Sequence, residues 1–178
     1  MIELKAEQPD DRWEVEALYD LCFAPGREAL SSYRLRDNVP PVPGLSQVAR
    51  DELGILAGAI RFWPVHIEAD DPQKLHQVTA LLLGPVAVHP THQGEGLGGS
   101  LIRDSLAQAS ERGWQRVMLV GDAPYYRRFG FERLSGVKMP PPTNPERVLG
   151  LHSDTGAWDG VSGRVTRWQG ELVEPGTP

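Results

Sequence analysis

Residues 81–100 read Leu81-Leu-Leu-Gly-Pro-Val-Ala-Val-His-Pro-Thr-His-Gln-Gly-Glu-Gly-Leu-Gly-Gly-Ser100 and organise the rest of the chain. The first half is uncharged and rich in Leu and Val, which predicts a strand buried on both faces. The second half is rich in glycine and leads into apolar residues spaced by three and four, as on one face of a helix. These residues are Leu97, Leu101, Ile102, Leu106 and Ala109, with Gly113 as the expected C-terminal cap. The predicted order is strand, glycine loop, helix.

A glycine loop that opens a helix exposes free backbone N–H groups at the positive end of the helix dipole, an arrangement suited to phosphate. Gly94, Gly96 and Gly99 spell the dinucleotide fingerprint G-x-G-x-x-G, with Asp122 at the end of the next strand as a ribose ligand. That fingerprint places its first glycine directly after the strand, whereas residues 89–93 intervene here. A dinucleotide site is therefore the weaker of two interpretations.

The same loop contains Gln93-x-x-Gly96-x-Gly98, and a second segment, Tyr126-Arg-Arg-Phe-Gly-Phe131, follows downstream. Together they resemble the GNAT (Gcn5-related) N-acetyltransferase superfamily, whose acetyl-coenzyme A (acetyl-CoA) motif lies between a strand and a helix. The residues around the loop are similar to the branch of YhbS-like predicted acetyltransferases. The resemblance implies an α/β fold: a single GNAT domain with a central mixed, splayed β-sheet and helices on both faces. We expect this domain to span residues 1–170, followed by a mobile C-terminal tail, 171–178.

Length and composition agree with one compact domain: the chain has 178 residues and a formal net charge of -6. This charge argues against general nucleic-acid binding. Apolar runs are too short to span a membrane, and the charged start does not resemble a signal peptide. The single cysteine, Cys22, forms no internal disulfide and is expected to be a core residue of a cytoplasmic protein. We expect no nucleic-acid or membrane partner. If the protein self-associates, a homodimer is the expected assembly.

Periodicity predicts the remaining elements in outline. A helix is expected after Asp11-x-x-Glu14, which resembles a capping box, with an apolar stripe formed by Trp13, Ala17, Leu18, Leu21 and Cys22. Further helices are expected over residues 27–37 and after Asp122-Ala-Pro124. The expected strands are 2–6, 45–50, 55–65, 78–89, 116–121, 132–138, 148–152 and 160–168.

Pro85 cannot donate to a sheet ladder, so together with Gly84 it predicts a bulge or a missing pairing in the central strand. In a GNAT fold this strand separates from the following strand, and the pantetheine arm of the cofactor enters the gap between them. The alternative is a sheet irregularity without functional meaning.

The resemblance also implies the site residues. Backbone groups of Val86, Ala87 and Val88 would pair with the pantetheine amides, and the Val88 N–H would stabilise the developing oxyanion. The backbone of the loop would hold the pyrophosphate, although its glycines could also serve only as a tight turn and a cap. The expected cofactor-binding residues are Val86, Ala87, Val88, Gln93, Gly94, Glu95, Gly96, Leu97, Gly98, Gly99, Ser100 and Tyr126.

Tyr126 fits the family position of the general acid, because a neutral phenol can protonate a departing thiolate. The alternative is that it is a packing residue, the interpretation favoured for Tyr125. No general base is assigned, because Leu81–Val88 carries no carboxylate. The weak candidates are His89, Glu28 and Asp122.

Two further sets of side chains carry the charge or the ring nitrogens that cofactor or metal binding would need. Arg103, Arg127 and Arg128 are candidates for the phosphates of the cofactor, or belong to solvated faces. His89 and His92 lack a cluster of Cys or carboxylate partners, so no metal site is expected.

The expected reaction is transfer of acetyl from acetyl-CoA, the cosubstrate, to a primary amine of a small molecule or peptide. The amine would attack directly in a ternary complex. A non-catalytic acyl-CoA sensor is the main alternative, since a general base is missing.

Overall fold

The computed structural model describes residues 1–23, 27, 30–71, 73 and 77–169. In this part of the chain nine strands form one sheet in the order β1-β2-β3-β4-β5-β8-β6, and β9 pairs with both β3 and β7. The pairs β4–β5 and β7–β9 are parallel and the others antiparallel, so the sheet is mixed, as predicted. The strands are β1 (Glu3–Ala6), β2 (Gln47–Arg50), β3 (Leu56–Glu68), β4 (Gln77–Val88), β5 (Val117–Val120), β6 (Phe131–Arg133), β7 (Val137–Lys138), β8 (Val148–Leu151) and β9 (Gly163–Arg167).

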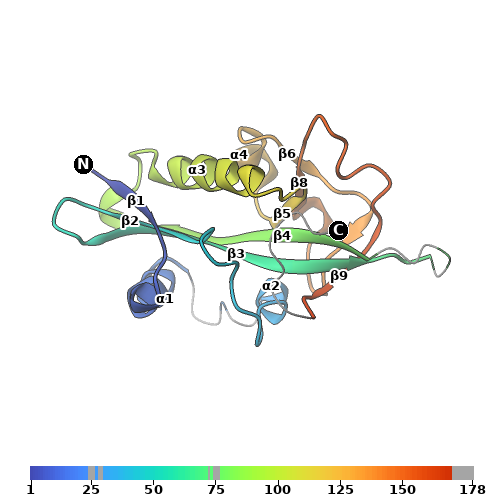
Figure 1. The fold of residues 1–178 in the computed structure, drawn as a ribbon, viewed down its shortest axis with the longest axis horizontal. Helices are drawn as coiled ribbons and strands as arrows, with labels where there is room; N and C mark the ends of the chain where they lie inside the picture. The colour runs from blue at the N-terminus through green and yellow to red at the C-terminus, as the bar shows by residue number, and fades with distance from the viewer. Residues whose placement is uncertain (24–26, 28–29, 72, 74–76, 170–178) are drawn as a thin grey trace.

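Helices cover both faces of the sheet, which confirms the predicted fold class. Figure 1 shows α1 and α2 on one face and α3 and α4 on the other. The α-helices are α1 (Arg12–Cys22), α2 (Ser31–Arg34), α3 (Leu97–Glu111) and α4 (Ala123–Arg127). Short 3-10 helices are η1 (Pro9–Asp11), η3 (Pro90–His92) and η4 (Pro145–Arg147).

Strand β4 is buried on both faces, as its sequence predicts. Leu81 and Leu83 pack in the cluster beneath α3, whereas Ala80 and Leu82 pack in a second cluster on the opposite face. Alternating side chains of a strand point to opposite faces, so a continuous apolar run is what this position requires.

Helix α3 begins and ends where glycine predicts. Gly96 is the N-cap residue in the left-handed region, with φ 78°, and Gly113 follows the last turn with φ 86°. The Trp114 N–H donates to the Ala109 carbonyl at 3.0 Å, the backbone bond of a Schellman cap. Leu101 and Ile102 of the predicted apolar stripe are fully buried.

The stripe predicted for α1 is partly wrong. Trp13 is 77% exposed and Leu21 is 58% exposed, whereas Val15, Leu18 and Tyr19 form the buried face. These three positions follow the i, i+3, i+4 spacing of a single helix face, and Trp13 and Leu21 lie off it.

The helix start also differs from the predicted capping box. The Asp11 carboxylate accepts from the Gln8 N–H at 2.8 Å, and Arg50 of β2 binds both Asp11 and Glu14. The chain before α1 and strand β2 therefore take up the carboxylates expected to cap the helix.

Several predicted bounds change because the pairing partners lie far away in the sequence. The strand expected over 132–138 is two strands, since β6 pairs with β8 and β7 pairs with β9. Of the helix expected over 27–37, the described residues show α2 followed by a turn. Glu28 and the tail 171–178 lie outside the described residues.

Candidate cofactor and acceptor site

Strands β4 and β5 part soon after they begin to pair. The parallel register contains Leu81 with Val117 and Leu82 with Met118, and among the described residues it goes no further. On its other side, β5 continues to pair with β8 up to Val120. A gap therefore opens beside β4 from Leu83 onward.

The Gly84–Pro85 irregularity lies at the start of this gap. Gly84 has φ 124°, and the register between β4 and β3 shifts between Ile60 and Phe62, opposite these two residues. The prediction of a bulge or missing pairing is confirmed on both sides of the strand: a bulge toward β3 and lost pairing toward β5.

Backbone groups of β4 alternate in direction beyond the bulge. The His89 N–H donates to the Ala57 carbonyl at 2.8 Å, and hydrogen-bonded pairs alternate with non-hydrogen-bonded pairs in an antiparallel ladder. The pair Ala87–Ala59 is therefore hydrogen-bonded, whereas the backbone groups of Val86 and Val88 point away from β3.

The edge of β4 at Val88 is held by two neighbouring side chains. The Val88 carbonyl accepts from Gln93 Nε2 at 3.2 Å and from Cys22 Sγ at 3.3 Å. Burial raises the pKa of the Cys22 thiol, which agrees with a packing role for this side chain.

The glycine loop forms the floor of a cavity of about 350 Å³. The Ser100 N–H donates to the Gly96 carbonyl, so the N–H groups before it in α3 have no partner within the helix. A Cβ added at Gly98 would lie 3.6 Å from both Tyr125 Oη and Val88 Cγ2, so the missing side chain keeps the floor open. The cavity is lined by Val88, His92, Gln93, Gly94, Gly96, Leu97, Gly98, Gly99, Arg103, Tyr125, Arg128 and Phe129.

Two of the three candidate arginines flank this loop cavity. The Arg103 guanidinium lies 5.0 Å from the Phe129 ring, and Arg128 lies 4.9 Å from the Tyr125 ring. Arg127 is exposed and does not line the cavity. The loop therefore combines free N–H groups with two cations, the environment expected around a diphosphate.

The histidines of this region have local roles. The Thr91 N–H donates to His89 Nδ1, which places His89 as the N-cap of η3. His92 lies 3.1 Å from the Glu95 carboxylate at the rim of the loop cavity. Among the described residues, no group of three or more His, Cys, Asp or Glu is placed to hold a metal ion.

A second cavity, of about 320 Å³, extends from the parted strands toward α2, and we call it the acyl cavity. Tyr126 of α4 lines it, whereas Tyr125 lines the loop cavity, so the two adjacent tyrosines face different spaces. Burial, together with the neighbouring Tyr125 phenol, raises the pKa of Tyr126 to about 12. The Tyr126 phenol is therefore protonated at neutral pH. The other lining residues are Phe23, Arg27, Leu30, Ser32, Tyr33, Arg36, Leu82, Leu83, Gly84, Pro85, Val86, Leu119, Val120, Gly121, Asp122 and Arg147.

Two carboxylates near the acyl cavity, those of Asp122 and Glu16, are already engaged. Asp122, its one acidic lining residue among those described, accepts from the Tyr125 N–H at 3.3 Å and caps α4. Glu16 lies in a third, adjoining cavity of about 280 Å³, together with Arg27, Arg36 and Arg61. Burial raises the pKa of Glu16, but hydrogen bonds from Arg61 and Arg27 outweigh it and hold the pKa below its ordinary value. Asp122 thus serves as a helix cap and Glu16 as an ion-pair partner, and neither is assigned as the general base.

The third cavity was not predicted from the sequence, although the position of Arg61 could have indicated a buried group of charges. Arg61 lies within the apolar strand β3, and its side chain is only 8% exposed. Arginine is rarely buried unless it is paired, so a charge within such a run indicates carboxylates nearby. The partners themselves, Glu7 and Glu16, could not be identified from spacing.

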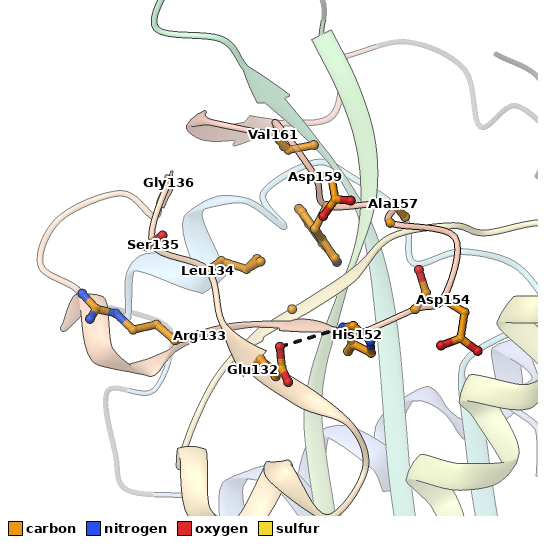
Figure 2. Close-up of a pocket in the computed structure, with 14 residues that line it drawn as sticks. Glu132, Arg133, Leu134, Ser135, Gly136, His152, Asp154, Ala157, Asp159 and Val161 are labelled. Carbon is orange, nitrogen blue, oxygen red and sulfur yellow. Dashed lines mark ion pairs between the residues drawn. The ribbon is translucent and has the colours of Figure 1, made fainter.

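A fourth cavity, of about 490 Å³, lies at the C-terminal side of the sheet, away from the parted strands. Figure 2 shows it between β6 and the segment after β8, with Glu132 and His152 side by side at one edge; their charged groups lie 3.9 Å apart. Both side chains are mostly exposed. None of the predicted site residues lines this cavity, and its acidic groups form a solvated surface.

Comparison with known proteins identifies the family. Residues 5–134 match the family model described as "Acetyltransferase (GNAT) domain". The chain belongs to the GNAT acetyltransferase family. The dinucleotide interpretation of the glycine loop is thereby set aside.

In the described residues, no helix combines the length and the apolar character needed to cross a membrane.

Relatives of this GNAT protein occur in Escherichia coli. The "Uncharacterized N-acetyltransferase YhbS" of strain K12 is 32% identical over 129 residues, 72% of each chain. The "Uncharacterized N-acetyltransferase YjhQ" of the same strain is 33% identical over 136 residues, which is 76% of this chain and 72% of that protein.

Two similar solved structures contain the cofactor. The structure of YhbS from Escherichia coli in complex with CoA has a TM-score of 0.76 at 26% identity, covering 99% of this chain and 96% of that one. A GNAT family acetyltransferase from Brucella melitensis in complex with acetyl-CoA has a TM-score of 0.61 at 31% identity, covering 89% of this chain and 99% of that one.

Proposed function

We propose that this GNAT protein transfers the acetyl group of acetyl-CoA to a primary amine of a small molecule or peptide, by direct attack in a ternary complex. The observation that carries the proposal is the exposed edge of β4, which joins two cavities. Val88 lines the loop cavity and Val86 lines the acyl cavity. The similar structures solved in complex with CoA and acetyl-CoA support this choice of cosubstrate.

The loop residues fit the cofactor. In our proposal, backbone N–H groups at the start of α3 bind the pyrophosphate, and Arg103 and Arg128 add positive charge. The backbone of Val86 hydrogen-bonds a pantetheine amide, because it faces the gap, and the Val88 N–H faces the same gap and is left for the thioester. Ala87 pairs with β3, so the proposal gives it no hydrogen bond to the cofactor. The proposed cradle consists of Gln93, Gly94, Glu95, Gly96, Leu97, Gly98, Gly99 and Ser100.

Bound acetyl-CoA would supply a thioester. Residues of the chain would stabilise the negative charges that develop on its carbonyl oxygen and its sulfur as the thioester is cleaved. The Val88 N–H is the proposed donor to the carbonyl oxygen, where negative charge develops. Tyr126 is the proposed donor to the departing sulfur. A pKa of about 12 keeps the proton on Tyr126 throughout the physiological range, so this phenol acts as an acid and not as a base.

We expect acceptor-dependent release of free thiol when the protein, acetyl-CoA and a panel of primary amines are combined. Calorimetry with acetyl-CoA, run alongside, reports cofactor binding independently of turnover. Tight binding of acetyl-CoA without thiol release for any amine would favour the sensor alternative. The observation behind that alternative is that the one described carboxylate lining the acyl cavity, Asp122, serves as the cap of α4.

Replacing Tyr126 by phenylalanine should lower kcat by about 100-fold, because general acid catalysis contributes factors of this size. The dissociation constant of acetyl-CoA should change little, because Tyr126 lines the acyl cavity and not the loop cavity. Tyr125→Phe is the matched control and should leave kcat within about 3-fold of the original value. Unchanged turnover in Tyr126→Phe, measured where chemistry limits the rate, would remove Tyr126 from the mechanism.

The domain bounds and the location are also proposals. We propose a GNAT domain over residues 1–170, which the family match over residues 5–134 supports. A cytoplasmic location is supported by Cys22, a free thiol.

A further inference from the structure

Arg36, in the turn after α2, lies between the acyl cavity and the third cavity and lines both. Its guanidinium carbon lies 4.2 Å from the centre of the Tyr33 ring and 5.7 Å from that of Trp63. Nε and Nη1 are buried and have no hydrogen-bond partner among the described residues. Packing on the two rings explains the position of the guanidinium but leaves these donors unused.

Other arginines of the third cavity are neutralised. Arg27 binds the carboxylates of Glu16 and Asp20, at 2.8 and 3.0 Å. Arg61 binds Glu7 at 2.7 Å and Glu16 at 2.5 Å.

Arg36 differs from them, because it forms no ion pair with a carboxylate of the described residues. Asp37 lines the third cavity but is exposed. Among the described residues, the acyl cavity thus has a cation in its wall, Arg36, that no carboxylate compensates.

A buried guanidinium without a counter-charge is unfavourable. Burial lowers the pKa of Arg36 to about 10, which still leaves the side chain charged at neutral pH. An incoming anion would restore the charge balance. The planar guanidinium matches a carboxylate through two parallel hydrogen bonds. Among the described residues that line the acyl cavity, Arg27 is paired and Arg147 is exposed to water, which leaves Arg36 as the buried cation. A single buried charge suits one carboxylate better than a dianionic phosphate.

We propose that Arg36 binds a carboxylate of the acceptor, so that the acetylated amine belongs to a molecule that also carries a carboxylate. This inference rests on the proposed acetyltransferase function and names its substrate class. Arg36 Nη2 would lie 3.8 Å from a Cβ added at Gly84, so the guanidinium adjoins the bulge of β4. The carboxylate then binds at this end, and the amine points along β4 toward Val88 and Tyr126. Leu83 and Leu119 in the same wall contact the apolar part between them.

The test compares acceptors that differ only in the carboxylate: β-alanine with ethylamine, 4-aminobutyrate with propylamine, and phenylalanine with 2-phenylethylamine. We expect the carboxylate member of at least one pair to have a KM at least about 10-fold lower. Arg36→Met should raise that KM by about 30-fold or more, since a bidentate charged contact is lost, and should leave the KM of the decarboxylated partner and of acetyl-CoA unchanged. Arg36→Lys should restore part of the affinity.

Arg34→Met is the matched control. Arg34 lies two positions earlier, is exposed, and lines neither cavity. The Arg34→Met variant should change no KM. Melting temperatures of both methionine variants close to that of the parent protein would show that the fold is intact. Equal KM values within every pair would overturn the carboxylate proposal, and so would an Arg36→Met variant that still prefers the acceptor with the carboxylate. In both cases, release of thiol would still uphold the acetyltransferase function.

Binding without turnover separates the two hypotheses if no amine releases thiol. N-acetylphenylalanine and N-(2-phenylethyl)acetamide are titrated by calorimetry into the CoA-loaded protein. We expect N-acetylphenylalanine to bind at least about 10-fold more tightly than the amide without the carboxylate, and we expect Arg36→Met to lose this difference. That result would support the carboxylate site even if the transfer reaction fails. Equal binding of the two compounds, or binding of neither, overturns it.

Discussion

Replacement of Gly98 by glutamate is expected to weaken acetyl-CoA binding by at least about 100-fold, measured by calorimetry. Gly98 lies in the first turn of α3, at the floor of the loop cavity. A Cβ there would make ordinary contacts, 3.6 Å from Tyr125 Oη and from Val88 Cγ2, so the helix tolerates a side chain. The rest of a glutamate would fill the proposed diphosphate position and add a repelling charge.

Two control variants separate this effect from general damage. Ala107→Glu places the same side chain on an exposed position of the same helix and should leave affinity unchanged. Gly98→Ala adds only the tolerated Cβ and should weaken binding by less than about 10-fold. All three variants should melt close to the parent protein. Wild-type affinity in Gly98→Glu would place the diphosphate elsewhere.

Arg61→Leu is expected to lower the free energy of unfolding by about 3–5 kcal/mol, as measured by denaturant titration. Arg61 binds Glu7 and Glu16, and the Glu7 side chain is only 10% exposed. Removing the cation leaves these carboxylates without a partner, and the loss is a large part of the stability of a typical domain. The added Glu7→Gln substitution should recover part of it, because it removes one of the stranded charges.

Arg50→Leu is the matched control for burial. Arg50 lies on the neighbouring strand β2 and also binds two carboxylates, Asp11 at 2.6 Å and Glu14 at 3.0 Å. The Glu14 side chain is 55% exposed, so water can solvate it once the arginine is gone, and Asp11, 16% exposed, keeps its bond from the Gln8 N–H. We expect this variant to lose less than about half as much stability. Equal losses in Arg50→Leu and Arg61→Leu would contradict the role assigned to burial.

The pH dependence of the Arg61→Leu effect follows from Glu16. Burial raises the pKa of Glu16, but the bonds from Arg61 and Arg27 hold it below the ordinary value of 4.5. A carboxylate with a lowered folded pKa contributes stability that is complete above its unfolded pKa and is lost as the pH falls through the folded pKa. The difference between the parent and Arg61→Leu should therefore shrink once the pH falls below 4.5.

The fold around residues 81–113 could be predicted from sequence because its signals are local. An apolar run, a Gly96 N-cap and a Gly113 cap define β4, the loop and α3 within one continuous segment. The Gly84–Pro85 irregularity could be predicted for the same reason, since Pro85 has no N–H to donate wherever it lies.

Predictions failed where the deciding partner lies far along the chain. Trp13 and Leu21 are apolar but lie off the face of α1 that the sheet covers. The strand expected over 132–138 divides because its two ends pair with different strands.

The amino-acid sequence alone determined the family, the strand-loop-helix unit and the candidates Gly98, Val88 and Tyr126. The tertiary structure decided that Tyr126 and Tyr125 face different cavities, and that Ala87 pairs with β3. It also decided that no carboxylate in the described part of the chain pairs with Arg36, while Glu7, Glu16 and Asp20 neutralise its neighbours. Glycine, proline and apolar periodicity act within a few residues, so they can be read along the chain. The balance of charges in a cavity depends on side chains from separate elements, and only folding brings these together.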